Sequence, residues 1–334
     1  MKYVVKSLLV AATLAVSSTL VSAQTLSIEA GGSASTTGLI PQSFAPYASK
    51  AGYDLQVVLD QVLTKSVLKV GAGKLDLAVT PPPAFKSMQA GKGPYSSNAE
   101  QSMELAKNVR ALFAFQGSTM HPTVWADSSI KNWEDVRGKR VFIGPPAGAA
   151  AGQTTGMIEA ASGLKADVDY EAIKLPWGQA TQGFQDGQYD VYVAYFPVGS
   201  QSITELGLQR AVRLLGLPEG LTETDSWKTY ENQSGVTGVN IPSGTYGDAV
   251  VNSTDSIDAA ATSMMIVTNA SMSEEAAYNL TKAYFDALPE MKQSNALLKS
   301  QDESKPLFGI TAKLHAGAIR YYKEKGINIP EDLM

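Results

Sequence analysis

The sequence predicts an α/β protein built from two lobes. Three observations lead to this prediction: short β-rich runs alternate with helical stretches, the pattern restarts partway along, and the chain is long. Once an N-terminal leader is removed, Gln24 to Met334 remains, which exceeds the roughly 250–300 residues at which one hydrophobic core stops growing. The strand–helix–strand rhythm predicts mostly parallel sheets with helices on their faces.

The N-terminal segment has the pattern of a secretory signal. Lys2 and Lys6 supply positive charge, an uncharged run rich in Leu, Val and Ala follows, and Val21-Ser22-Ala23 closes it with small residues. We expect cleavage after Ala23. A membrane anchor would need roughly 20 apolar residues, whereas this run has about 15 and no basic residues stop it. Because the chain has no cysteine for a lipid anchor, we expect a freely diffusing protein of the periplasm, with secretion to the medium as the alternative.

The first half of the chain predicts one series of elements. We expect strands at 25–30, 54–59, 75–79 and 111–115, and helices at 39–50, 66–72 and 99–107. Gly52 is placed to end the first helix. Pro81-Pro82-Pro83 stops the third strand, since proline cannot donate to a ladder. The pattern restarts after Gly117.

The second half predicts a similar series. We expect strands at 123–126, 140–143, 171–175, 188–196 and 211–215, and helices at 132–136, 152–161, 179–185, 200–206, 274–288 and 313–325. We place the connections between lobes near 116–119 and 251–262. The first lobe then comprises 24–118 and 257–334, and the second lobe 119–256. Such a discontinuous protein has a cleft between its lobes, where a hinge can close on a ligand.

Composition argues against several functions. The formal net charge is −5 and no basic run occurs, so nucleic acid and anionic membranes are poor candidates as partners. Without cysteine, thiol nucleophiles and thiolate metal sites are excluded. His121 and His315 are far apart and outside any H-E-x-x-H pattern, and no G-x-S-x-G elbow or phosphate loop is present. We therefore expect a protein that is not an enzyme and holds no cofactor or metal. We also expect it to be a monomer.

Two small-residue loops carry the strongest functional signal. Each follows a predicted strand and precedes a helix: residues 31–38 include Ser33, Ser35, Thr36 and Thr37, and residues 145–155 include Gly148, Gln153 and Thr154. The first N–H groups of a helix lack intrahelical partners, and the helix dipole adds positive charge there. Two such loops, one in each lobe, favour a shared anion site. The alternative is that their hydroxyls cap the helices.

Further candidates stand at other strand ends. Ser66 follows the second strand, Thr80 the third, and Trp177 the strand at 171–175, while Tyr195 and Phe196 end the strand at 188–196. In open α/β sheets, ligands bind beyond the carboxyl ends of the strands. The three aromatic side chains are predicted to form an apolar wall with the Tyr195 hydroxyl as a polar group. The alternative is that they pack the interior of the lobe.

The order of these motifs resembles the TAXI family, the extracytoplasmic solute receptors of one branch of the TRAP transporters. The matching pieces cover nearly the whole mature chain: GGSASTTG, TKSVLKVGAGKLDLAVTPP, NWEDVRGKRVFIGPPAGAAAGQT, GFQDGQYDVYVAYFPVG and KLHAGAIRYYKEKGINIPEDL. The resemblance implies a two-lobe periplasmic-binding-protein fold, type II-like, with the ligand cleft between the lobes. It also implies delivery of a small carboxylate to a membrane permease that is driven by an ion gradient.

The resemblance also implies a set of site residues. Carried over position by position, they are Ser33, Ser35, Thr36, Thr37, Ser66, Thr80, Gly148, Ala149, Gln153, Thr154, Tyr195 and Phe196, to which the strand-end argument adds Trp177. These loops offer no acidic partner for an ammonium group, so we favour a carboxylate without an amine. The competing interpretations are a receptor of an ABC importer, an exported enzyme on the same fold and a structural envelope protein.

Overall fold

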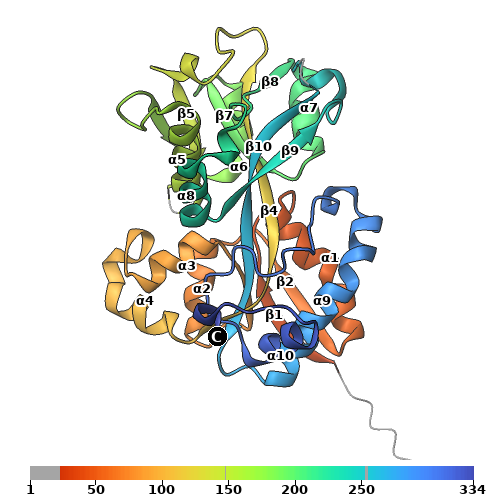
Figure 1. Cartoon of the computed structure of the whole chain (residues 1–334). Coiled ribbons are helices and arrows are strands. Elements are labelled where there is room, and N and C mark those ends of the chain that lie inside the picture. Colours follow the sequence, from red (N-terminus) through yellow and green to blue (C-terminus); the bar gives the residue numbers. More distant parts are fainter. Residues whose placement is uncertain (1–22, 147, 253–254) are drawn as a thin grey trace, which may run out of the picture.

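The computed structural model describes residues 23–146, 148–252 and 255–334. The predicted secretory signal lies outside these residues except for Ala23, its last position. Among the described residues, no helix is long and apolar enough to cross a membrane. The chain folds into two lobes, which lie one above the other in Figure 1.

Two long antiparallel strands run through both lobes and join them (Figure 1). They are β4 (Val109–Trp125) and β10 (Ser256–Asn269). The lower half of β10 pairs with β3, and its residues 256–262 pair with β9 in the upper lobe. This upper half includes residues that the predicted division assigned to the first lobe from 257 onward. The crossing between lobes therefore lies within two continuous strands.

The lower lobe is a mixed sheet in the order β2-β1-β3-β10-β4 with helices on both faces. Strand β1 is parallel to its neighbours β2 and β3, whereas β10 runs antiparallel to β3. Its other elements are β1 (Gln24–Glu29), α1 (Thr36–Lys50), β2 (Tyr53–Val58), α2 (Leu63–Gly71), β3 (Leu77–Thr80), α3 (Pro82–Gln89), α4 (Ala99–Ala106), α9 (Glu274–Ser294) and α10 (Ala316–Glu324).

The upper lobe continues the sheet from β4 through β7 and β5 to β6, with β8 on β4 and β9 on β10. Its elements are β5 (Arg140–Gly144), α5 (Ala150–Ser162), β6 (Glu171–Lys174), α6 (Trp177–Gln185), β7 (Val191–Phe196), α7 (Gln201–Gln209), β8 (Val212–Leu214), α8 (Asp225–Ser234) and β9 (Val236–Pro242). Short 3-10 helices lie at Gly93–Asn98, Glu134–Val136, Leu221–Glu223, Gly247–Ala249, Ala296–Leu298 and Glu331–Leu333.

Each face of the lower sheet has its own core because side chains alternate along a strand. On one face, Ile28 packs with α1 and α9, and Phe113 of β4 stacks on Tyr284 of α9 with ring centroids 3.9 Å apart. On the other face, Phe85 and Tyr322 pack with α2 and α10. Burying a large apolar side chain contributes about 1.5–3 kcal/mol. The loops at the end of the lower lobe that faces the upper lobe are thus carried by strands and helices whose side chains pack into these cores.

Three sequence predictions differ from the structure. The predicted restart after Gly117 is wrong, because β4 continues through it. A Cβ on Gly117 would overlap the Thr262 side chain of β10, so glycine permits the close approach of the two strands there. Helix α3 begins at Pro82, directly after the strand stop, because proline fits the first turn of a helix. Helix α8 and strands β9 and β10 were not predicted.

Candidate functional site

The loop after β1 folds tightly around its glycines. A Cβ on Gly31 would overlap the Thr37 side chain, and one on Gly38 would overlap the backbone of Gly32. The loop therefore depends on residues without a side chain at these two positions. This fold brings the hydroxyl oxygens of Ser35 and Thr37 within 2.6 Å of each other, at the start of α1.

Helix α1 begins without a side-chain cap from its own loop. The Ser35 hydroxyl donates to the carbonyl of Gly32 (2.7 Å), and no side chain of this loop caps the first turn. The backbone N–H of Thr36 donates instead to the hydroxyl of Ser118 in β4 (3.2 Å). Thr36 and Thr37 are buried, whereas Ser33 is exposed on the loop. The capping alternative is therefore not met at this helix.

The second loop also precedes a helix that its own side chains do not cap. The N-cap of α5 is Ala149, which has no hydroxyl, and no side chain caps the helix. Positions 148–151 are half-buried and carry only Gly and Ala, so the backbone of the first turn is accessible. Helices α2, α3, α4 and α6 likewise lack a side-chain cap, whereas α7, α8, α9 and α10 are capped by Ser200, Thr224, Ser273 and His315. The two predicted loops thus precede helices whose first turns lack this side-chain cap.

The predicted residues farther along α5 face inward and support this turn. The Gln153 amide donates to the carbonyl of Ser234 (2.9 Å) at the end of α8. The Thr154 hydroxyl lies 2.8 Å from that of Tyr195, which in turn donates to the carbonyl of Ala150 (3.2 Å). Burial raises the pKa of Tyr195 well above its ordinary value, so its hydroxyl stays protonated. The hydrogen bonds of Gln153 and Thr154 therefore hold the start of α5, and with it the preceding loop, in place.

The predicted aromatic wall is wrong in one of its three members. The Trp177 ring, 45% exposed at the start of α6, lies with its centroid 5.3 Å from that of Tyr195. Phe196 is the next residue along β7, so its side chain points to the opposite face of the sheet. There it packs with Ala194 and Tyr246 in the other core of the upper lobe. Trp177 and Tyr195 alone form an aromatic pair beside α5.

Ser66 and Thr80 lie near the ends of strands in the lower lobe. Ser66 is fully buried in the first half of α2, and its hydroxyl donates to Glu29 Oε2 (2.7 Å). Lys69 donates to the other oxygen of this carboxylate at 2.5 Å. Thr80 ends β3 and is fully buried, and its Oγ1 has no hydrogen-bond partner among the described residues. Such an atom calls for a water or a ligand group.

Sequence reasoning missed Glu29 and the hydroxyl residues where the lobes meet. The Thr262 hydroxyl donates to the carbonyl of Ser118 (3.2 Å), joining β10 to β4 at the crossing. Ser263 donates through its N–H (2.7 Å) and its hydroxyl (3.0 Å) to the carbonyl of Gly235, which follows α8. A signal was present: Ser-Thr and Thr-Ser pairs interrupt two long apolar runs. Glu29 could have been found as the one charged residue closing an apolar strand.

The structure gathers the predicted residues into two groups, one for each lobe. The residues of the first loop lie near Ser118 of β4, and those of the second loop lie near Tyr195 and Trp177. Among the described residues, no hydrogen bond joins the first loop to the second. The lobes touch elsewhere, where the Lys86 ammonium of α3 donates to the carbonyl of Asn232 in α8 (2.8 Å). Figure 1 shows α8 directly above α3 at this contact.

The two histidines have structural roles. His121 of β4 is fully buried, and its Nδ1 lies 2.9 Å from the carbonyl of Thr119, which can only accept. Its Nε2 therefore accepts from the Tyr246 hydroxyl (2.6 Å). Burial lowers the pKa of His121 to about 4, so the ring is neutral at pH 7. His315 caps α10 by accepting from the N–H of Gly317 (3.2 Å). In the described ranges, no group of three or more His, Asp or Glu could hold a metal ion.

Comparison with known proteins supports this architecture. The sequence model of the NMT1-like family matches residues 60–326. A protein from Bordetella bronchiseptica RB50 is similar in structure, with a TM-score of 0.50, 16% identity, and coverage of 92% of this chain and 85% of that one. The periplasmic aliphatic sulphonate binding protein of Escherichia coli has a TM-score of 0.48 and 16% identity, with coverage of 90% and 83%.

A TRAP periplasmic solute binding protein from Xanthobacter autotrophicus Py2 with bound β-D-galacturonate has a TM-score of 0.46 and 13% identity, with coverage of 92% and 96%. Identities this low speak for the fold alone. The predicted fold class, an α/β protein of two lobes, is confirmed (Figure 1).

Proposed function

Because this chain belongs to the NMT1-like family, we propose that it is a periplasmic solute receptor that binds a small organic anion between its lobes. The observation that carries this proposal is a matching pair of small-residue loops, one in each lobe, each placed directly before a helix start; the lack of a side-chain cap alone is shared by α2, α3, α4 and α6. Helices α1 and α5 follow small-residue loops, one in each lobe, and neither loop caps its helix with a side chain.

An anion suits these helix starts. Unpaired N–H groups of a first turn and the positive end of the helix dipole both favour negative charge. Neither loop carries a charged side chain, so the binding free energy would come from N–H and hydroxyl donors rather than from an ion pair. Ser35 donates its hydroxyl proton to Gly32 and Thr37 donates its own to Ser35, so the unpartnered Oγ1 of Thr80 is a hydroxyl donor that the lower lobe leaves available among the described residues.

The mechanism we propose is hinge closure. Strands β4 and β10 form the double connection, and the hydroxyl residues at their crossing hold it together. A ligand that touches both lobes favours the closed arrangement, because it makes contacts there that the open arrangement lacks. The Trp177–Tyr195 pair would cover the apolar body of the ligand.

We further propose that the ligand is a carboxylate without an amine. Two carboxylates stand at the strand ends of the lower lobe: Asp60, beside Gly32, is exposed, and Glu29 already has both oxygens engaged by Ser66 and Lys69. Glu29 therefore has little capacity left for a ligand ammonium group. The receptor would act as a monomer and, as the TAXI resemblance implies, deliver its ligand to a TRAP-type permease.

A thermal-shift screen of the mature protein tests the proposal. The panel holds mono- and dicarboxylates, sulphonates, amino acids, neutral sugars and divalent metal ions. A ligand at 100 times its dissociation constant stabilises the native state by about 2.7 kcal/mol, which gives a readable shift. Shifts confined to carboxylates support the proposal. Shifts with sulphonates alone keep the anion site and reject the carboxylate, whereas shifts with sugars, metals or nothing reject both.

The transporter class has its own test. A gene for a large multi-span permease beside this one supports delivery to a TRAP transporter. A neighbouring ATPase gene would instead assign the receptor to an ABC importer.

A further inference from the structure

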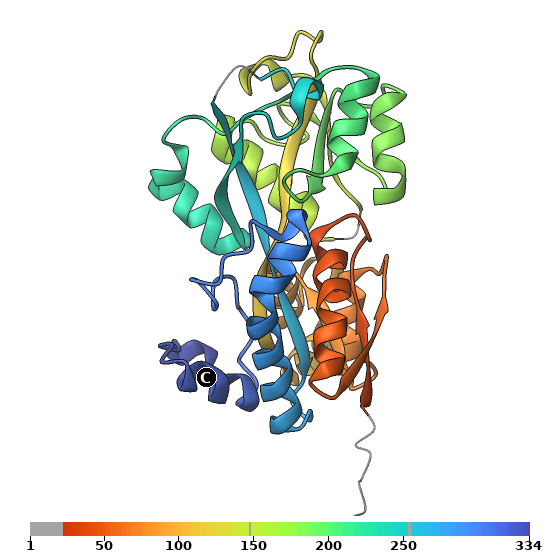
Figure 2. The ribbon, with the colours of Figure 1, turned by 90° about the vertical axis from the view of Figure 1, so that its right-hand side faces the viewer.

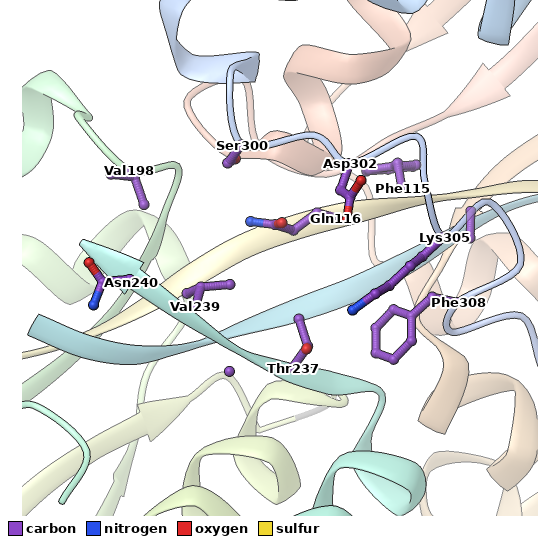
Figure 3. Close-up of a pocket in the computed structure, with 12 residues that line it drawn as sticks. Phe115, Gln116, Val198, Thr237, Val239, Asn240, Ser300, Asp302, Lys305 and Phe308 are labelled. Carbon is purple, nitrogen blue, oxygen red and sulfur yellow. The ribbon is translucent and has the colours of Figure 1, made fainter. Parts of the chain in front are cut away.

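A pocket spans the two lobes and contains none of the residues predicted from the sequence (Figure 3). Its volume is about 340 Å³, near the lower end of the range for ligand sites. The lower lobe contributes Ala114, Phe115, Gln116, Ser300, Asp302, Lys305 and Phe308, and the upper lobe contributes Val198, Thr237, Gly238, Val239 and Asn240.

This pocket lies on the other side of the connecting strands from the first loop. Figure 2 shows the segment after α9 (blue) and β9 (teal) to the left of β4, with the loop before α1 (red) to the right. In the lower sheet, β1 and β3 stand on the β10 side, whereas Gln301 binds the free edge of β4. The candidate anion cleft and this pocket are therefore separate.

The pocket walls are fixed to the two connecting strands. Gln301 accepts from the N–H of Gln116 (2.9 Å) and donates to its carbonyl (2.7 Å), which anchors the segment that carries Asp302 and Lys305. On the upper side, β9 is held in register on β10, with Gly238 opposite Ala260. Hydrogen bonds to the connecting strands thus fix the backbone that carries the polar side chains of the pocket in both lobes.

The charges of the pocket are arranged unevenly. Lys305 points its ammonium into the space between Thr237 and Phe308 in Figure 3. Among the residues that the structure describes, no carboxylate lies within 4.0 Å of it, whereas nearby Lys292 is paired with Glu303. Asp302 accepts from the N–H of Ser304 (2.9 Å), and this bond together with nearby lysines holds its pKa below the ordinary value. A lysine without a carboxylate within 4.0 Å and a carboxylate that this lysine stabilises at longer range therefore flank one cavity.

We propose that this pocket is a second binding site, for a small monocarboxylate with an apolar body. The carboxylate pairs with Lys305, and the body packs against Phe308 and Val239. The charge of Asp302 repels a second negative group, so a dicarboxylate binds less well than a monocarboxylate of the same size. The side chains of Asp302 and Lys305 are exposed, which leaves a path for entry.

Benzoate and phthalate are the probes for this site, measured by calorimetry on the mature protein. Benzoate should bind at least tenfold more tightly than phthalate. Lys305→Met should weaken benzoate binding at least tenfold, and Asp302→Asn should bring phthalate closer to benzoate. The matched control is Lys299→Met, which removes an exposed lysine of the same segment that does not line the pocket.

Two outcomes overturn the proposal: no benzoate binding at millimolar concentration, or benzoate binding that Lys305→Met and Lys299→Met leave equally unchanged. A cleft variant, Thr154→Ala, separates the two sites. If Thr154→Ala abolishes benzoate binding and Lys305→Met does not, benzoate occupies the cleft, which overturns the second site and leaves the proposed function intact. If the screen finds no cleft ligand while benzoate binding still depends on Lys305, the second site stands and the proposed function falls.

Discussion

The hydroxyl of Ser118 lies 3.2 Å from the backbone nitrogen of Thr36, and this hydrogen bond joins the strand between the lobes to the first turn of α1. Both residues are almost completely buried. The loop that we propose for anion binding is thus tied to the part of the molecule where the lobes would move. A substitution at Ser118 should therefore alter the loop, even though Ser118 was not predicted as a ligand residue.

Removal of the Ser118 hydroxyl should destabilise the protein. Ser118→Ala leaves the buried N–H of Thr36 without its acceptor, which costs about 1–3 kcal/mol. Denaturant unfolding measures this loss in the free energy of unfolding. The matched control is Ser96→Ala, since Ser96 is exposed and should change stability by less than about 0.5 kcal/mol. Equal stability of the two variants would contradict the role given to this bond.

The threonines of the two helix starts should matter for binding. Thr36→Ala and Thr154→Ala should each weaken binding of the anion found by the thermal screen about fivefold or more, because each removes a hydroxyl that contacts or supports a loop. Both variants should remain folded. Thr229→Ala removes an exposed threonine of α8 and should bind like the wild type. Unchanged affinity in both loop variants, measured by calorimetry, would refute this assignment.

Loss of the cation beside Glu29 should be costly. Lys69→Met leaves a mostly buried carboxylate with only the Ser66 hydroxyl as a partner, and we expect a loss of about 1–3 kcal/mol in the free energy of unfolding. Lys65 lies on the same helix, is exposed, and has no carboxylate within 4.0 Å among the described residues. Lys65→Met should therefore be nearly neutral, and a similar loss in both variants would argue against a specific Glu29–Lys69 pair.

The free energy of unfolding should decrease as the pH decreases, because of His121. Its pKa is lowered to about 4 in the folded protein, against about 6.5 in an unfolded chain. Between these values the unfolded chain binds a proton that the folded protein does not, so stability is full above pH 6.5 and is lost as the pH falls toward 4. The loss attributable to this residue is roughly 3 kcal/mol at most.

Unfolding in denaturant at pH 7, 5.5 and 4.5 measures this dependence. His121→Gln should flatten it, although a smaller slope of the same sign remains because burial also lowers the pKa of His315. A variant with the same slope as the wild type would show that His121 is not the group responsible.

Much of the fold follows from the sequence, but not the parts that join the lobes. Parallel strands alternating with helices are visible as a pattern, since each strand is short and apolar and each helix is amphipathic. Strand β10 is buried on both faces, so it shows no alternation, and its Ser and Thr residues resemble a loop. Helix α8 was missed because it is polar, with only Trp227 and Ser234 buried.

The sequence predicted some parts of the candidate site and missed others, and each outcome has a physical reason. Loop positions could be found from their small residues, because backbone access needs them. The directions of side chains depend on register, which is why Phe196 faces away from Tyr195. The partners of buried groups depend on residues distant in the sequence. Nothing in the sequence near Ser66 indicates that its hydroxyl donates to Glu29.

The position of β10 has a consequence for the order in which the protein assembles. This strand fills the middle of the lower sheet, between β3 and β4, yet it is made only after the whole upper lobe. A chain emerging from its N-terminus cannot complete the lower lobe until the residues beyond 256 have appeared. The upper half of β10 likewise completes the pairing of β9. Both lobes therefore reach their final sheets through one late segment, so neither lobe can complete its sheet during synthesis before β10 has been made.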